Sequence, residues 1–145
     1  MATNQKINQE TELNSLQQLV GTLILLVEDE PDIADLLTFI LEAAGAEVMA
    51  LSDAEEALFL VESLHPDILL CNMKLPDRDG SWLIEQIRVH SCPSLRQLPA
   101  IAITSYTREV SSYKALNAGF NRFLVKFESP EEIVNEIANL LSTEL

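Results

Sequence analysis

The sequence predicts an α/β fold in which a five-stranded parallel sheet carries five helices on its two faces. Short apolar runs such as Thr22 to Val27 and Ile68 to Cys71 end abruptly in polar residues, which is typical of strands buried on both faces of a parallel sheet. Between these runs, apolar residues recur three and four positions apart, as they do in amphipathic helices. Strands that alternate with helices favour right-handed crossovers and therefore a parallel sheet.

The expected strands follow from the apolar runs. In chain order, they cover residues 22–27, 47–51, 68–71, 100–103 and 123–125. The first, third and fourth are the most apolar and should lie inside the sheet, whereas the second is short and mixed and should lie at an edge. This placement matches the flavodoxin-like strand order 2-1-3-4-5 of doubly wound sheets.

Local signals place the first two helices. Pro31 suits the first turn of a helix that Gly45 ends. Ser52 followed by Glu55 has the pattern of a capping box, so the second helix should start there.

The remaining helices are predicted in the same way. We expect a third helix over residues 82–89, a polar loop over 90–98, and a fourth helix capped by Thr107 and ended by Gly119. The apolar positions of the fourth helix are Val110, Tyr113 and Leu116. Pro130 opens the last helix, whose apolar positions are Ile133, Ile137, Leu140 and Leu141.

The N-terminus differs in composition from the rest of the chain. Residues 1–20 are rich in Gln, Asn and Glu, and we expect an arm that is partly helical or disordered, followed by one domain over residues 21–145. Leu13, Leu16 and Val20 are spaced three and four apart, so a short amphipathic helix that binds a partner or a second copy is the alternative.

The net charge of −14, from 9 basic and 23 acidic residues, excludes some partners. A domain this acidic repels phosphate backbones and anionic lipids, so we expect neither nucleic-acid binding nor membrane binding. The longest apolar run, Leu23 to Val27, is far too short to span a membrane. Residues 1–10 lack the apolar core of a signal peptide. The expected location is the cytoplasm.

Polar side chains follow four of the predicted strands. Glu28 and Asp29 follow the first strand, Asn72 the third, Thr104 the fourth and Lys126 the fifth. Because the carboxyl ends of parallel strands meet at one edge, these side chains should lie close together. Two adjacent carboxylates suit a hard cation such as Mg²⁺. A lysine and a threonine hydroxyl suit a phosphoryl oxygen.

Four stretches carry a resemblance to a known family. They are Leu-Leu-Val-Glu-Asp-Glu-Pro-Asp at 25–32, Pro-Asp-Ile-Leu-Leu-Cys-Asn-Met-Lys-Leu-Pro-Asp-Arg-Asp-Gly at 66–80, Ala-Ile-Thr-Ser at 102–105 and Leu-Val-Lys at 124–126. From about residue 23 to residue 141, the sequence resembles a response-regulator receiver domain of bacterial two-component signalling.

The resemblance implies a set of roles. In that family, an acidic pair holds Mg²⁺ while an aspartate after the third strand takes a phosphoryl group from a kinase histidine. The implied metal ligands are Glu28, Asp29, Asn72 and Lys74, and Asn72 stands at the phosphoacceptor position. The implied switch and phosphoryl-contact residues are Thr104, Phe123 and Lys126.

Three positions depart from the family's pattern. Asn72 replaces the aspartate, and a carboxamide is a far poorer nucleophile than a carboxylate. The pocket also has one negative charge fewer, so Mg²⁺, the implied cofactor, should bind more weakly. Phe127 replaces the usual proline, and we expect a trans Lys126–Phe127 peptide because a non-proline cis bond costs about 3–4 kcal/mol. Phe123 cannot hydrogen-bond as a tyrosine does.

The leading hypothesis is a stand-alone, aspartate-less (pseudo-) receiver of a phosphorelay. It would be a monomer or weak homodimer that signals by contact with a histidine kinase or another signalling protein, and it would not be an enzyme. No output domain follows Leu145, so any effect should pass through a partner. By family analogy, the contact surface is formed by the last two helices and the fifth strand, with Arg108, Tyr113 and Arg122.

The alternative is an ordinary Mg²⁺-dependent phosphoacceptor receiver whose aspartate has been replaced by Asn72 through engineering. An aspartyl-nucleophile phosphatase fits less well, because Asp29 is followed by Glu30 and Pro31 and so lacks a second aspartate two residues later. FMN binding is also disfavoured, because no phosphate-binding loop rich in Gly, Ser or Thr follows the first strand.

Overall fold

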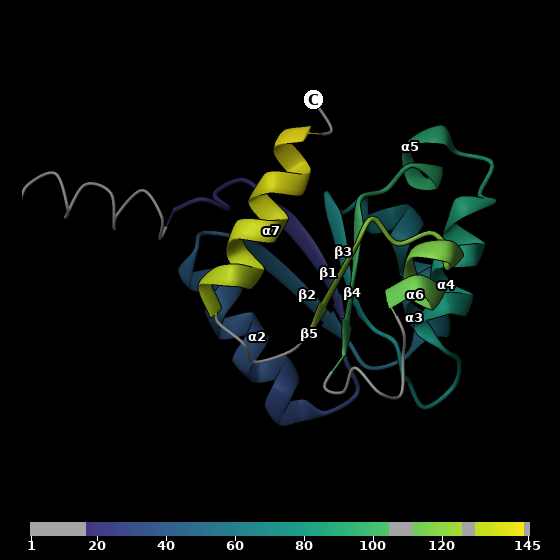
Figure 1. Cartoon of the computed structure of the whole chain (residues 1–145), viewed down its shortest axis with the longest axis horizontal. Helices are drawn as coiled ribbons and strands as arrows, with labels where there is room; N and C mark the ends of the chain where they lie inside the picture. Colours follow the sequence, from purple (N-terminus) through teal and green to yellow (C-terminus); the bar gives the residue numbers. More distant parts are fainter. Residues whose placement is uncertain (1–16, 105–111, 126–129, 144–145) are drawn as a thin grey trace, which may run out of the picture.

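The computed structural model describes residues 17–104, 112–125 and 130–143. Five strands in these residues form one parallel sheet (Figure 1). The strands are β1 (Leu23–Val27), β2 (Glu47–Leu51), β3 (Ile68–Asn72), β4 (Ala100–Thr104) and β5 (Arg122–Val125). Their order is β2-β1-β3-β4-β5, which confirms the predicted order and the edge position of β2.

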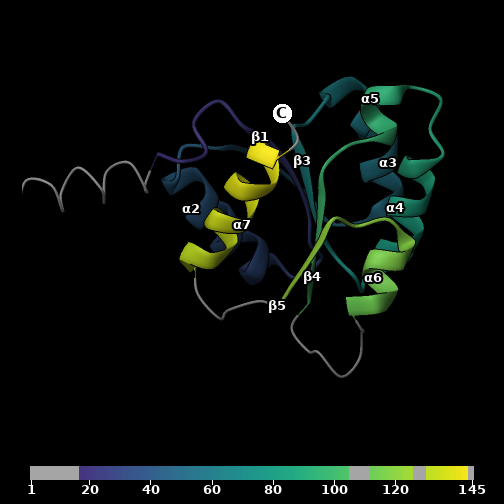
Figure 2. The same cartoon turned by 45° about the horizontal axis from the view of Figure 1, so that its top comes forward.

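Helices cover both faces of the sheet. Helices α2 and α7 lie on one face, and α3, α4, α5 and α6 lie on the other (Figures 1 and 2). Their bounds are α2 (Pro31–Ala43), α3 (Ala54–Leu64), α4 (Gly80–Arg88), α5 (Pro93–Arg96), α6 (Ser112–Ala118) and α7 (Pro130–Thr143). The described part of the chain thus has six helices, one more than predicted, and none of them is long and apolar enough to cross a membrane.

The additional helix, α5, lies in the segment 90–98 that was expected to be a loop. Pro93 takes the first helical position, where its missing N–H has no intrahelical partner to lose. The N–H of Arg96 donates to the carbonyl of Cys92 at 2.9 Å, and Leu95 is buried in the core. A single buried leucine holds this turn in place, and one apolar residue in a polar segment gives no periodic signal.

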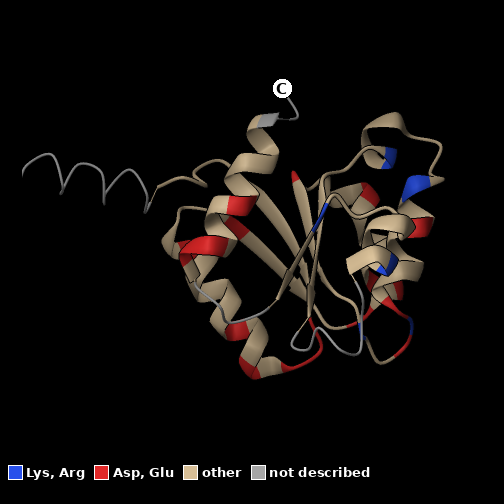
Figure 3. Ribbon diagram, viewed as in Figure 1, with Lys and Arg blue, Asp and Glu red and all other residues tan. Residues whose placement is uncertain are grey.

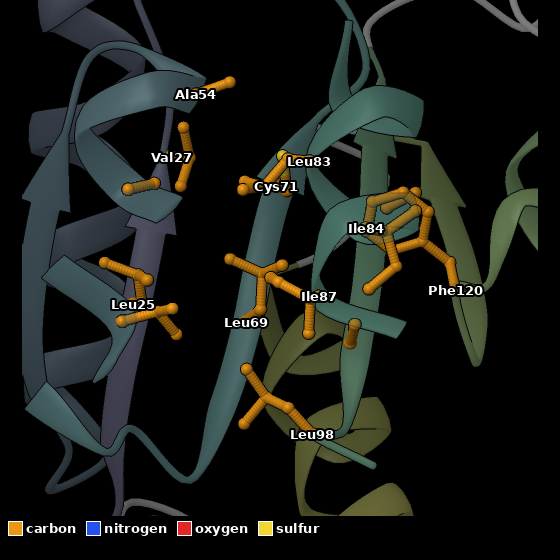
Figure 4. Packing of buried hydrophobic residues seen from close by; sticks show 14 of the residues in the cluster. Leu25, Val27, Ala54, Leu69, Cys71, Leu83, Ile84, Ile87, Leu98 and Phe120 are labelled. Atoms are coloured by element: carbon orange, nitrogen blue, oxygen red, sulfur yellow. The ribbon is translucent and has the colours of Figure 1, made fainter. Parts of the chain in front are cut away.

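The buried strands alternate between two cores. In β1, Leu25 and Val27 face α3, α4, α5 and α6, while Ile24 and Leu26 face α2 and α7. Figure 4 shows the first of these cores, in which Ile87 of α4 points toward the sheet. Removal of both faces of the inner strands from water is the main stabilising contribution to this fold.

The N-terminus of α3 is capped one residue later than expected. Asp53, not Ser52, is the N-cap, and its Oδ1 accepts the backbone N–H of Glu56 at 2.7 Å. The expected Ser52–Glu55 box is therefore wrong. β2 continues to Leu51, which leaves Ser52 outside the first turn of the helix.

A second aspartate binds the same helix end from a distant loop. The Asp77 carboxylate, between β3 and α4, accepts the backbone N–H groups of Ala54 at 3.0 Å and Glu55 at 2.9 Å. Partial desolvation raises the pKa of Asp77, but these backbone hydrogen bonds outweigh it and hold the pKa below its ordinary value. Asp77 therefore ties the β3–α4 loop to α3.

Helix α6 differs from its predicted pattern. It is described over Ser112–Ala118, and the residue that it buries is Ala115. Tyr113 and Leu116, expected on the apolar side, are 76% and 47% exposed. Because the buried residue, Ala115, is small, this short helix lies close to the rest of the domain. The larger side chains of Tyr113 and Leu116 therefore point toward solvent. Two further predicted residues of this helix, Thr107 and Val110, lie outside the described residues.

Residues 17–20, at the end of the expected arm, lie against the domain. Leu19 is fully buried in the core under α2, and its N–H donates to the carbonyl of Ala44 at 2.9 Å. These contacts fix the point at which the N-terminal segment reaches the domain.

Helix α4 begins at Gly80, two residues earlier than expected, and ends at Arg88. The Gly80 N–H donates to the Met73 carbonyl at 2.8 Å. A Cβ atom at position 80 would lie only 2.6 Å from the carbonyl oxygen of Asn72. Because that oxygen belongs to the backbone at the end of β3, only glycine allows α4 to start so close to the strand.

Substitution Gly80→Ala should lower the free energy of unfolding by about 1–3 kcal/mol, because overpacking against a backbone atom forces the chain to shift. Urea denaturation followed by circular dichroism measures this loss. Ser63→Ala, at an exposed position of α3, is the control for a small substitution and should change stability by less than about 0.5 kcal/mol. Equal stability of Gly80→Ala and the unmodified chain would contradict the close approach.

Substitution Asp77→Ala should lower the free energy of unfolding by about 1 kcal/mol at neutral pH, because two helix N–H groups lose their acceptor. Since the folded-state pKa lies below the ordinary value of 3.8, this contribution is complete above that value and disappears as the pH falls through the folded-state pKa. The difference from the unmodified chain, measured by urea denaturation, should therefore be constant from about pH 5 to 8 and shrink below about pH 4.

Asp79→Ala is the matched control, because Asp79 carries the same charge in the same loop but its side chain caps no helix. An equal loss in both variants would show that loop charge, and not the hydrogen bonds to α3, sets the effect.

Candidate functional site

The carboxyl ends of the five strands lie at the lower edge of the sheet in Figure 1. The strand register brings these ends to one level: Val27 pairs with Cys71, and Asn72 pairs with Ile103. The carboxyl ends of β1, β3 and β4 therefore lie at one edge of the sheet.

Asn72 is the centre of the described hydrogen bonds at this edge. Its Nδ2 donates to Oδ1 of Asp29 at 3.3 Å and to the carbonyl oxygen of Lys74 at 2.9 Å. Both partners are acceptors, so only the amino side of the amide can face them. The structure thus joins three of the four predicted metal ligands through one side-chain amide.

Two polar side chains at this edge are buried. Glu28 is 3% exposed and Thr104 is 5% exposed, and together with Ser81 they are the buried polar or charged residues among those described. Burial of a carboxylate disfavours folding unless specific contacts offset the lost hydration. Groups of this kind at the ends of buried strands are therefore typical of functional sites.

The loop after β3 is held in place from two sides. Asp77 binds the N-terminus of α3, and the N–H of Gly80 binds the Met73 carbonyl. Both contacts fix the path of the loop, and hence the position of the Lys74 carbonyl. The sequence did not indicate that Asp77 has this role, because its partner Ala54 lies 23 positions earlier in the chain.

The remaining predicted residues are only partly described. Phe123 of β5 is half-buried and packs on the core beneath α3 and α4. Lys126 and the Lys126–Phe127 peptide lie outside the described residues, so the trans geometry stays a prediction.

Hydrogen bonds from Asn72 already engage two of the oxygen atoms that could bind Mg²⁺. Mg²⁺ requires oxygen ligands, and two candidate oxygens, Asp29 Oδ1 and the Lys74 carbonyl, instead accept hydrogen bonds from Asn72. Among the described residues, no three Asp, Glu, His or Cys side chains form a group that could hold a metal ion. For the Asn72 carbonyl to face a cation, the amide would have to turn over and lose both hydrogen bonds.

Comparisons with known proteins agree with this geometry. The family model "Response regulator receiver domain" matches residues 24–138. A 14.6 kDa protein of uncharacterised function from Leptolyngbya boryana is 42% identical over 119 residues, which are 82% of this chain and 89% of that protein. Other relatives, 29–31% identical, include transcriptional regulators, and the chain spans only about half of their length, 47–50%.

Solved structures give the same result. A crystal structure of a response regulator from Chloroflexus aurantiacus is 32% identical, has a TM-score of 0.78, and is aligned over 83% of this chain and 98% of that one. The receiver domain of the sensor histidine kinase PA1611 from Pseudomonas aeruginosa, with magnesium in its active-site cleft, is 28% identical. Its TM-score is 0.77, over 85% of this chain and 99% of that one. With its sheet order, its strand-end residues and this match over most of its length, the chain belongs to the response regulator receiver domain family.

Proposed function

We propose that this chain is a stand-alone signalling module of a two-component system that acts by protein contact and is not phosphorylated at position 72. The observation that carries the proposal is the hydrogen-bonded amide of Asn72 at the end of β3. Asn72 is the last residue of the central strand β3, and the neighbouring strands β1 and β4 end at the same level.

The chemistry of the amide supports this proposal. Phosphoryl transfer to a receiver requires an oxygen nucleophile that is ionised at neutral pH, and a carboxylate meets this requirement. The oxygen of a carboxamide carries no net charge, and its nitrogen is engaged by Asp29 and Lys74. No acyl phosphate of the family's type can form on such a group.

The same hydrogen bonds support weakened binding of Mg²⁺. A cation at this edge would compete with the Asn72 amino group for the oxygens of Asp29 and Lys74. An amide in place of a carboxylate also removes one negative charge from the pocket. We therefore propose that Glu28 and Asp29 hold Mg²⁺ only weakly.

Protein contact is then the remaining route for a signal. The surface proposed for a histidine kinase or another signalling protein comprises α6, β5 and α7. Tyr113 is 76% exposed on this surface, and Arg122 forms a partly exposed ion pair with Glu136 at 3.7 Å. The alignment covers 89% of the Leptolyngbya relative, which supports action as a separate domain. We further propose that this domain acts in the cytoplasm as a monomer or weak dimer.

Incubation with Mg²⁺ and acetyl phosphate should leave the intact mass of this chain unchanged. The Asn72→Asp variant is the comparison, because it restores the carboxylate and changes the side chain little in shape. A base-labile adduct of one phosphoryl group on the variant alone would show that the amide of Asn72 is what prevents phosphorylation of the unmodified chain. A stoichiometric adduct on Asn72 of the unmodified chain would refute the proposal.

Titration with Mg²⁺ should show an apparent affinity about tenfold or more higher for Asn72→Asp than for the unmodified chain, a difference of about 1.4 kcal/mol or more. The single tryptophan, Trp82, lies in the first turn of α4 beside the site, so its fluorescence can report binding. NaCl added to the same ionic strength is the control for non-specific salt effects. Equal Mg²⁺ affinities for the two proteins would contradict the role assigned to the amide.

A further inference from the structure

A groove separate from this site lies between α2 and α7. It has a volume of about 490 Å³ and is lined mainly by apolar side chains, among them Leu36, Phe39, Ile40 and Val134. Phe39 is 73% exposed and Leu36 is 43% exposed. Neighbouring apolar residues this accessible to water indicate a surface that is covered when the protein functions.

The N-terminal segment of the chain reaches the domain at one end of this groove. Gln18 lines the groove together with Ala43 and Ala44, while Leu19 is buried and donates its N–H to the Ala44 carbonyl. The 16 residues that precede Gln17 are therefore attached at the rim of the groove. A tether this short gives a segment a high effective concentration at a neighbouring surface.

We propose that residues 1–16 dock into the groove between α2 and α7. Leu13 and Leu16, spaced three apart, supply apolar side chains next to the attachment point, and Ile7 supplies a third. Burial of these residues against Phe39 and Leu36 removes apolar surface of both partners from water, which is favourable.

The distribution of charged residues also supports residues 1–16 as the segment that occupies the groove. Residues 7–73 contain neither Lys nor Arg, so Lys6 is the only Lys or Arg before Lys74. Glu131, in the first turn of α7, lines the groove, and α2 carries Asp32 in its first turn. Figure 3 shows acidic residues on α2 and α7, whereas the basic residues of the described helices lie on α4, α5 and α6.

The length of residues 6–18, if helical, matches the length of residues 32–43 of α2. A helix rises about 1.5 Å per residue, so the twelve steps from Gln18 back to Lys6 span about 18 Å. The eleven steps from Ala43 back to Asp32 along α2 span about 17 Å. A helical arm that runs beside α2 from the Gln18 end would therefore be long enough to bring Lys6 to the first turn of α2, where Asp32 lies.

Methyl NMR spectra of the full chain and of a chain that starts at Gln17 test this proposal. The shorter chain keeps Leu19, so its core is intact. We expect shifts of the methyl signals of Leu36, Ile40 and Val134, while Leu69 and Ile84, in the other core, should not move. A synthetic peptide of residues 1–16, added to the shorter chain, should restore the original signals.

The variant Leu13→Asp/Leu16→Asp in the full chain should reproduce the effect of the truncation. The matched control is Thr11→Asp/Ser15→Asp, which adds the same charge at polar positions and should leave the groove signals in place. Unchanged groove signals on truncation would overturn the proposal. Groove signals that depend on protein concentration in both chains would instead assign the groove to a second copy, and would also overturn it.

Discussion

The central strand β3 is the constraint on which the rest of this structure depends. It pairs with β1 on one edge and with β4 on the other, and the side chains of Ile68 to Cys71 are fully buried. A slip by one residue would turn every one of these side chains to the opposite core, so the register is strongly fixed. The position of residue 72 relative to its neighbours is therefore set by the core of the protein.

Within this fixed geometry, the difference between an amide and a carboxylate is one of charge and hydrogen-bond direction. An aspartate at position 72 would add a third carboxylate beside Glu28 and Asp29, and like charges this close disfavour one another unless a cation or a proton intervenes. The amino group of Asn72 donates to Asp29 and Lys74 instead. We propose that this edge of the sheet is stable without a metal for that reason.

If the chain lacks the phosphorylation chemistry of a receiver, as we propose, the same hydrogen bonds help to keep the shape of a receiver. The Asn72 amide links the end of β1 to the loop after β3, and Asp77 and Gly80 fix that loop from its other side. Local contacts thus hold the loop in place. On this proposal, the module presents a constant surface to its partner.

Much of the fold could be predicted from the sequence, because apolar runs report burial and the carboxyl ends of parallel strands must share an edge. The convergence of Asp29 and Asn72 follows from that rule. The hydrogen bonds of Asn72 could not be predicted, because they depend on the path of the following loop. That path is set by Asp77, whose partner on α3 is 23 positions away, and by the close approach of Gly80 to the backbone of Asn72.

Other features were missed because they depend on single residues. One buried leucine, Leu95, stabilises α5 within a polar segment, and one alanine, Ala115, decides which side of α6 faces the core. Neither produces a periodic pattern. The alternative capping position, Asp53 rather than Ser52, depends on the residue at which β2 ends, which is the least certain part of a prediction from sequence.

The separation of charge along the chain has a consequence for how this molecule meets other proteins. Since residues 7–73 lack Lys and Arg, the basic side chains of the described residues all come from Lys74 onward. In space, the basic residues of the described helices lie on α4, α5 and α6, on the face of the sheet opposite to α2 and α7 (Figure 3). This uneven distribution gives the described part of the protein an electric dipole in addition to the chain's net charge of −14. A charged partner therefore exerts a torque on it during diffusion and turns a preferred side toward the encounter, an effect that weakens as the ionic strength rises.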